Sequence, residues 1–172
     1  MRPLIFLVGM PGVGKTVWGA RLARYYHWRH IDLDEQIEAQ VGKPVAALLA
    51  ENGEAVFRQH EQQALQQIID TVQEPVVVSC GGGTPVFFDN LERMQRNGCV
   101  IYLKAAIDTL VSHLQCDTRQ RPLLAGKSLP LKLGSLLAKR ETHYQQADYI
   151  FDVENLAEAT FAEIFAACTN RH

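Results

Sequence analysis

The chain has 172 residues, a length that one domain usually takes, and we expect residues 1–172 to form a single domain. Hydrophobic residues make up 47% and charged residues 21%, a composition that excludes a disordered or collagen-like chain. The net charge of −2 argues against a dedicated nucleic-acid binder, and the four scattered cysteines argue against a secreted disulfide scaffold. We therefore expect a cytoplasmic globular protein with reduced, mostly buried thiols.

Short apolar runs alternate with stretches of helical spacing along the chain. The run at residues 4–8 is too short for a signal peptide or a membrane span, so we expect a buried strand. Four further strands are expected at residues 30–33, 75–79, 99–103 and 149–153. Helical spacing covers residues 17–26, 34–41, 45–50, 55–72, 89–97, 107–115, 129–146 and 156–168. This alternation predicts a three-layer α/β/α fold with a parallel sheet between two layers of helices.

The first expected strand leads directly into a glycine-rich motif. Residues 9–16 read Gly-Met-Pro-Gly-Val-Gly-Lys-Thr, a full match to G-x-x-x-x-G-K-[ST] between a strand and a helix. Glycines let backbone N–H groups point at phosphate oxygens, while the lysine charge serves the β- and γ-phosphates and the threonine hydroxyl serves Mg²⁺. The motif therefore predicts a nucleoside triphosphate site formed by Gly12, Val13, Gly14, Lys15 and Thr16. No N-K-x-D motif is present, which argues against a GTPase.

Polar and glycine-rich segments follow the next two strands. Asp32-Leu33-Asp34 ends the second strand, at the carboxyl edge of the sheet where ligands bind in open α/β folds. Alternation along a strand would put both carboxylates on the same side of the sheet. One could then bind the water shell of a metal ion, and the other could contact the hydroxyl of a molecule that accepts a phosphoryl group. Alternatively, one of the two carboxylates, for example that of Asp34, simply caps the next helix. Gly81-Gly82-Gly83 follows the third strand, and three glycines in a row favour a backbone that a ligand approaches closely over a simple turn.

Two arginines occupy informative positions on expected helices. Arg140 falls on the apolar face of its helix, where a guanidinium requires an anionic partner. Arg58 precedes Glu61 by three residues, and taken alone this spacing favours a solvated ion pair. The planar fork of arginine suits a carboxylate. The two arginines therefore suggest that the molecule that accepts a phosphoryl group from the nucleotide is an acid. The polar stretch at residues 115–128 is long enough to be a functional lid.

Taken together, these residues closely resemble the shikimate kinase family from Leu4 to about Val153. The shared motifs are residues 9–16, Asp32-x-Asp34, Phe57-Arg58 with Glu61, Gly81-Gly82-Gly83, Arg121-Pro122-Leu123-Leu124, and Arg140 with Tyr144. The resemblance implies a nucleoside-monophosphate-kinase-like fold with a five-stranded parallel sheet and a lid. It also implies transfer of the ATP γ-phosphoryl group to the 3-hydroxyl of shikimate, giving shikimate 3-phosphate and ADP on the route to chorismate and the aromatic amino acids.

The resemblance also implies roles for residues in the acceptor site. Asp34 would hold the reacting hydroxyl, Arg58 and Arg140 would hold the shikimate carboxylate, and Gly82 would contact the substrate through its backbone. ATP and shikimate would be the ligands, so we expect no nucleic-acid or membrane partner. Nothing in the sequence demands a partner surface, and we expect a monomer.

On the nucleotide side, the resemblance implies that Thr16 and Asp32 belong to the Mg²⁺ site and that Arg121 reaches the ATP phosphates from the lid. Lys15, Asp34 and Arg121 would then be the catalytic residues. The family usually has an arginine before the lid that packs on adenine, but this chain has Ser112-His113-Leu114 there. Either His113 or Arg119 could replace that arginine, and the sequence does not decide between them.

Two other functions fit parts of the pattern. One is a kinase for another hydroxylated acid such as gluconate, from which the glycine triplet and the arginine pair would distinguish this chain. The other is a nucleotide-binding switch that uses the phosphate loop without turnover, and it predicts ATP binding with no acceptor-dependent hydrolysis.

Overall fold

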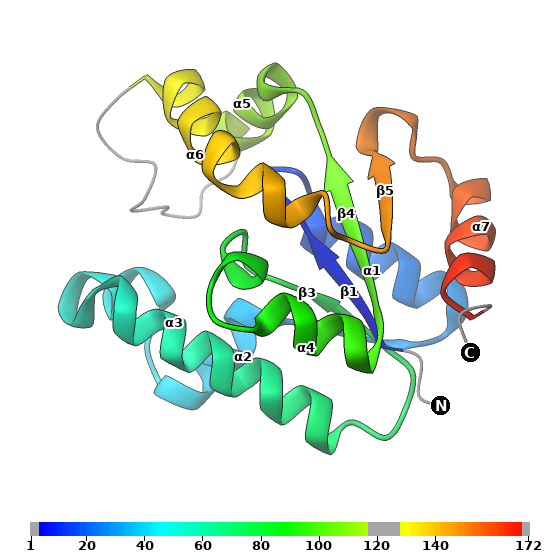
Figure 1. Ribbon diagram of the computed structural model, residues 1–172, viewed down its shortest axis with the longest axis horizontal. Coiled ribbons are helices and arrows are strands. Elements are labelled where there is room, and N and C mark those ends of the chain that lie inside the picture. Colours follow the sequence, from blue (N-terminus) through cyan, green and yellow to red (C-terminus); the bar gives the residue numbers. More distant parts are fainter. Residues whose placement is uncertain (1–3, 117–127, 170–172) are drawn as a thin grey trace.

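The computed structural model describes residues 4–116 and 128–169, and its centre is a five-stranded parallel sheet (Figure 1). The strand order is β2-β3-β1-β4-β5, so β1 lies in the middle. The strands are β1 Leu4–Val8, β2 Arg29–Asp32, β3 Val76–Ser79, β4 Cys99–Lys104 and β5 Tyr149–Asp152. The expected parallel sheet of five strands is confirmed.

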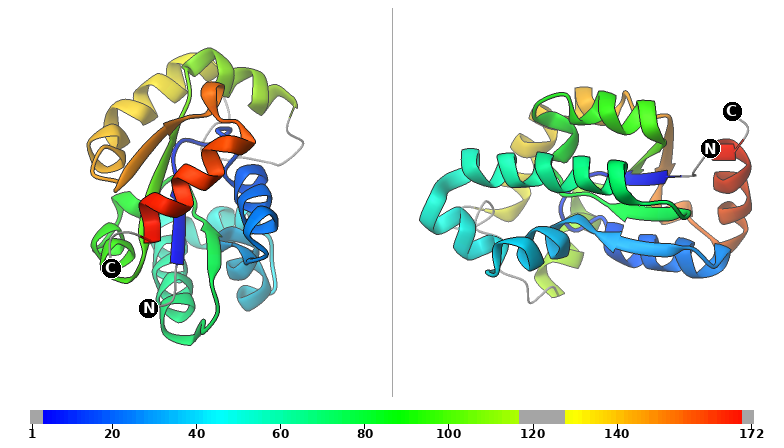
Figure 2. Two further views of the ribbon diagram at one scale, coloured as in Figure 1. Left: turned by 90° about the vertical axis from the view of Figure 1, so that its right-hand side faces the viewer. Right: turned by 90° about the horizontal axis from the view of Figure 1, so that it is seen from below.

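Helices cover both faces of the sheet. They are α1 Lys15–Tyr26, α2 Leu33–Val41, α3 Val45–Thr71, α4 Asn90–Asn97, α5 Ile107–Cys116, α6 Leu129–Tyr144 and α7 Glu158–Thr169. Helix α1 lies on one face with α7 nearby, whereas α3 and α4 lie on the other face (Figure 2). Helix α3 contains both of the helices expected between residues 45 and 72, joined across a kink at Gly53. The three-layer prediction is confirmed.

The core of the fold is the continuous apolar sequence of β1. All five of its residues are buried, and they pair in parallel with β3 on one side and β4 on the other. Phe6, for example, lies opposite Val78 and Val100. A strand between two layers of helices has no solvent-facing side, so alternation with polar residues is absent. This central position fixes the loop that follows Val8 at the carboxyl edge of the sheet.

The second strand ends earlier than the sequence pattern predicts. It stops at Asp32, and Leu33 already begins α2, so the expectation that Asp32 and Asp34 alternate along one strand is wrong. Asp32 is the N-cap of α2, and its Oδ1 accepts a hydrogen bond from the backbone N–H of Asp34 at 3.0 Å. The alternative that one of the two carboxylates caps the next helix is therefore confirmed, but the cap is Asp32 and not Asp34.

The last part of the chain also departs slightly from the expected boundaries. Residues Val153–Asn155 form a short 3₁₀ helix, and α7 begins at Glu158 instead of residue 156. Of the expected lid, residues 117–127 lie outside the described part of the chain, and they include Arg119 and Arg121. Within the described residues, no helix is both long enough and apolar enough to cross a membrane. None of the four cysteines, all of them described, is in a disulfide.

Candidate active site

The loop between β1 and α1 has the backbone of a phosphate cradle. Gly14 is the N-cap of α1 with φ 92°, a left-handed conformation that side chains rarely adopt. Glycine has no side chain that could cap the helix, so backbone N–H groups at the start of α1 stay directed toward the loop. The Lys15 Nζ lies over the same loop and donates to the carbonyls of Gly9 at 2.9 Å and Met10 at 3.0 Å. N–H groups and an ammonium therefore converge where an anion would sit.

A pocket of about 530 Å³ opens beside this loop. Its lining comes from four separate segments of the chain: the phosphate loop with the first turns of α1, the end of β2, the loop after β3, and the end of α5. The predicted site residues among its lining are Gly12, Val13, Gly14, Lys15, Thr16, Asp32, Asp34, Gly82 and His113. The structure thus brings the phosphate loop into one cavity with two of the candidate acceptor residues, Asp34 and Gly82, at the carboxyl edge of the sheet. The other two, Arg58 and Arg140, are not among the lining residues.

Thr16 and Asp32 meet at the edge of this pocket. The Thr16 hydroxyl donates to Asp32 Oδ2 at 2.6 Å, joining the first turn of α1 to the end of β2. A hydroxyl and a carboxylate are the hard oxygen donors that Mg²⁺ prefers, and Mg²⁺ in nucleotide sites takes only one or two protein oxygens besides phosphates and water. These two residues therefore fit a Mg²⁺ site next to the phosphate loop.

A polar network that the sequence did not suggest links the backbone of Lys15 to strands β2 and β3. The Ser79 hydroxyl donates to the Lys15 carbonyl at 2.9 Å, and His30 Nε2 lies 2.9 Å from the same hydroxyl oxygen. Since Ser79 uses its only hydrogen on the carbonyl, His30 must be the donor to Ser79. Burial lowers the pKa of His30, and the nearby carboxylates of Asp32 and Glu35 oppose that shift. The neutral ring thus holds the start of α1 against the sheet.

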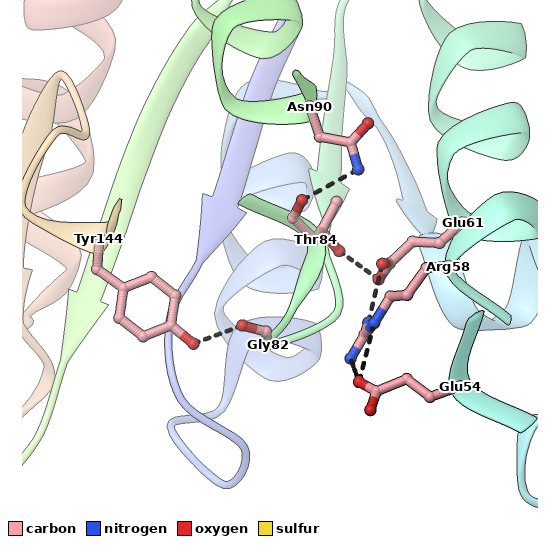
Figure 3. Close-up of polar contacts among 7 residues, drawn as sticks. All are labelled: Glu54, Arg58, Glu61, Gly82, Thr84, Asn90 and Tyr144. Atoms are coloured by element: carbon pink, nitrogen blue, oxygen red, sulfur yellow. Dashed lines mark hydrogen bonds and ion pairs between the residues drawn. The ribbon is translucent and has the colours of Figure 1, made fainter. Parts of the chain in front are cut away.

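Arg58 is held in a buried cluster of charges (Figure 3). Its guanidinium donates to Glu61 Oε2 at 2.9 Å and to Glu54 Oε1 at 3.0 Å, and the side chains of Arg58 and Glu61 are 4% and 0% exposed. The expectation of a solvated pair is therefore wrong: the spacing of three residues is right, but both groups face the core. Glu61 Oε1 accepts from the Thr84 hydroxyl at 2.6 Å, so both of its oxygens are used. Breaking such a buried pair costs about 3–5 kcal/mol.

Arg140 is also buried, as its place on the apolar face of α6 predicts, but its surroundings differ. Within the described residues it forms no ion pair, and the nearby buried carboxylate of Glu61 serves Arg58 and Thr84. Its Nη1 lies against Gly82, where an added Cβ would be 2.9 Å away. A buried guanidinium needs an anion, and this one lies directly behind a residue that lines the pocket.

The glycine triplet is required by the chain's own side chains. An added Cβ would be 2.6 Å from Glu61 Oε1 at Gly81 and 2.4 Å from Arg58 Nη2 at Gly83. The expected ligand approach is thus only part of the reason for three glycines: Gly81 and Gly82 line the pocket, while Gly83 makes room for Arg58.

His113, one of the two candidates for an adenine contact, lies at the pocket on α5. Its Nδ1 is 2.8 Å from the Gly12 carbonyl, so this ring nitrogen carries the hydrogen. The contact ties α5 to the phosphate loop. Whether His113 or Arg119 reaches adenine stays a prediction, because Arg119 lies outside the described residues.

Sequence reasoning missed several residues that support the site. Glu54 lies four residues before Arg58, a spacing typical of helical ion pairs, and could have been found. Thr84 and Phe87, whose ring centroid is 4.4 Å from Arg58 Cζ, carry no signal in the sequence because tertiary packing alone brings them to Arg58.

The fold and the site together define a P-loop kinase of the nucleoside-monophosphate-kinase type. A family model for shikimate kinase (SKI) matches residues 11–169. The shikimate kinase of Bacteroides fragilis is 41% identical over 162 residues, which cover 92% of this chain and 89% of that one. The chain belongs to the shikimate kinase family.

Two solved structures agree with this assignment. A crystal structure of shikimate kinase from Bacteroides thetaiotaomicron has a TM-score of 0.84 at 38% identity, covering 98% of this chain and 96% of the other. Shikimate kinase from Acinetobacter baumannii in complex with shikimate has a TM-score of 0.87 at 28% identity, covering 96% and 94%.

Proposed function

We propose that this protein transfers the γ-phosphoryl group of ATP to the 3-hydroxyl of shikimate, giving shikimate 3-phosphate and ADP. The observation that carries the proposal within the family is Arg140, a buried guanidinium that forms no ion pair among the described residues and lies behind Gly82 at the pocket. A carboxylate on the acceptor would supply the missing charge. The substrate's acid group and its reacting hydroxyl would then lie at two ends of one site.

On the nucleotide side, the backbone N–H groups from Gly12 to Gly14 would hold the phosphates, and Lys15 would neutralise charge on the transferring group. Lys15 would reach them by exchanging its bonds to the Gly9 and Met10 carbonyls for bonds to phosphate oxygens. Thr16 and Asp32 would hold Mg²⁺, directly or through its water. There the ion would supply positive charge that offsets the negative charge developing on the phosphates.

On the acceptor side, Asp34 would orient the attacking hydroxyl and accept its proton late in the transfer. Its backbone is fixed in the first turn of α2 by the Asp32 cap, which sets the side chain at the pocket. Arg58 and Arg140 would hold the carboxylate from α3 and α6, and the Gly82 backbone would contact the ring. Phosphoryl transfer asks the protein mainly for such positioning and charge stabilisation.

Water must be excluded, because it competes with the acceptor and would waste ATP. We assign this task to the segment at residues 115–128, with Arg121 reaching the ATP phosphates when it closes.

The test is ADP release by the purified protein with ATP and Mg²⁺, measured with and without shikimate. We expect release to depend on shikimate and one phosphate to appear on its 3-hydroxyl, read by ³¹P NMR. Gluconate at the same concentration should not support release. ATP binding without acceptor-dependent ADP release would contradict the proposal and favour a nucleotide-binding switch. ADP release with gluconate but not with shikimate would favour a kinase for another hydroxylated acid.

A further inference from the structure

Tyr144 lies one helical turn beyond Arg140 on α6, and its side chain is fully buried. Its hydroxyl donates to the backbone carbonyl of Gly82 at 2.5 Å, and the side chain points at that loop (Figure 3). The hydroxyl spends its only hydrogen on this bond. The Gly82 residue that it holds also packs against Arg140, whose Nη1 would be 2.9 Å from a Cβ added there. Through Gly82, one hydroxyl is therefore linked to the guanidinium of the candidate acceptor site.

The position of this hydroxyl is set by packing away from the pocket. The Tyr144 ring stacks on Tyr102 of β4, with ring centroids 4.9 Å apart and an angle of 25° between the rings. Burial raises the pKa of Tyr144 to about 12, and the charges of Arg140 and Arg58 only partly oppose that rise. The phenol is thus protonated at any physiological pH and donates at all times.

Gly82 is closely packed between the Arg140 guanidinium and the phosphate loop. An added Cβ on Gly82 would be 2.9 Å from Arg140 Nη1, 3.1 Å from the Pro11 ring and 3.3 Å from the Gly9 carbonyl oxygen. A rotation of the Gly82 peptide would therefore move the acceptor contact relative to both the guanidinium and the nucleotide loop. The Tyr144 hydroxyl holds one end of that peptide.

We propose that Tyr144 is a positioning residue for the acceptor, which fixes the Gly82 peptide and the Arg140 guanidinium relative to one another so that both address one acidic substrate. This inference rests on the proposed function. Without the hydroxyl, the Gly82 carbonyl loses the Tyr144 partner and the peptide beside Arg140 is held less firmly, yet both Gly82 and Arg140 remain in the protein. The loss should therefore affect acceptor binding more than the chemical step.

The test compares Tyr144→Phe with Tyr102→Phe. The two tyrosines are stacked neighbours and both are buried, but the Tyr102 hydroxyl donates to Glu141 Oε2 at 3.0 Å instead. Each variant loses one buried hydroxyl and keeps its ring, so any general cost to packing is shared. For each protein the KM for shikimate, the KM for ATP, kcat and the melting temperature are measured.

In Tyr144→Phe we expect the KM for shikimate to rise about tenfold, while kcat and the KM for ATP change by less than about twofold. In Tyr102→Phe all three constants should stay within about twofold of wild type. An unchanged KM for shikimate in Tyr144→Phe would overturn the proposal. Equal rises of this KM in both variants, or a parallel loss of ATP binding, would also overturn it, since they would indicate a general disturbance of packing. Failure of the wild-type protein to release ADP with shikimate would contradict the proposed function itself, and this inference with it.

Discussion

The guanidinium of Arg58 lies directly against the backbone of Gly83. An added Cβ on Gly83 would be 2.4 Å from Nη2 and 2.5 Å from Cζ, distances that no real contact shows. The guanidinium cannot simply move aside, because Glu61 and Glu54 hold it at 2.9 Å and 3.0 Å. A residue on the loop after β3 thus determines where an arginine of α3 can lie.

Gly83→Ala should therefore displace Arg58 and weaken acceptor binding. We expect the KM for shikimate to rise about tenfold or more, with the KM for ATP unchanged, because the phosphate loop is untouched. Gly134→Ala is the matched control: it makes the same change in α6, where an added Cβ meets nothing within 4 Å. Steady-state kinetics of both variants check this, and equal shikimate KM values would show that Arg58 does not bind the acceptor.

Lys15→Ala should abolish most of the turnover while leaving the fold intact. The Lys15 ammonium contacts backbone carbonyls of the loop, and Lys15 does not belong to the hydrophobic core. Removal of one preorganised positive group from a charged transition state costs about 10²–10³-fold in kcat. Kinetics and thermal melts check this, and near-normal kcat in a folded variant would refute the phosphate-cradle assignment.

Asp32→Asn should separate the two roles of Asp32, which are to cap α2 and to hold Mg²⁺. Asparagine caps a helix about as well as aspartate, so the bond to the Asp34 N–H and the melting temperature should persist. The lost charge should raise the Mg²⁺ concentration needed for half-maximal activity by about 10–100-fold. A Mg²⁺ titration of ADP release measures this. An unchanged Mg²⁺ requirement would mean that Asp32 only caps α2 and orients Thr16.

His30 predicts a loss of stability in mild acid. Burial lowers its pKa below the ordinary 6.5, so between 6.5 and the native value the unfolded chain binds more protons than the folded one. The free energy of unfolding should therefore fall as the pH drops from 6.5 through the native pKa. His30→Gln keeps an N–H for Ser79 and should flatten that part of the profile, as urea unfolding at several pH values would show. An unaltered slope in the variant would assign the acid sensitivity to other groups.

Sequence periodicity and one motif were sufficient for the sheet and the phosphate loop. The runs that form β1, β3 and β4 are buried on both faces and so carry a strong local signal, whereas the edge strands β2 and β5 are partly exposed. The glycine-rich motif at residues 9–16 is typical of one loop conformation between a strand and a helix. The second strand was misjudged because Leu33 is apolar enough to extend it, whereas the capping preference of Asp32 starts the helix one residue earlier.

The environment of the arginines could not be read from spacing alone. Arg140 was predicted to be buried because it interrupts an apolar face, but nothing in the sequence indicates that Tyr144 reaches Gly82 across 62 positions. For Arg58, the i,i+3 spacing to Glu61 is the same for a solvated and a buried pair. Only the packing of Thr84 and Phe87 from another segment decides between them, and such contacts leave no periodic trace.

The central claim is that Arg140 binds the carboxylate of the acceptor, and the most direct measurement is a double-mutant cycle across the protein and its substrate. It compares kcat/KM for shikimate and for its methyl ester with wild type and Arg140→Ala. We expect the variant to lose about 30-fold or more on shikimate, since truncating one partner of a desolvated charge pair costs about 2–5 kcal/mol. Wild type should lose a similar factor on the ester, and the variant should lose little more on the ester than on shikimate. Losses that simply multiply would show that the two groups do not meet and would contradict the account.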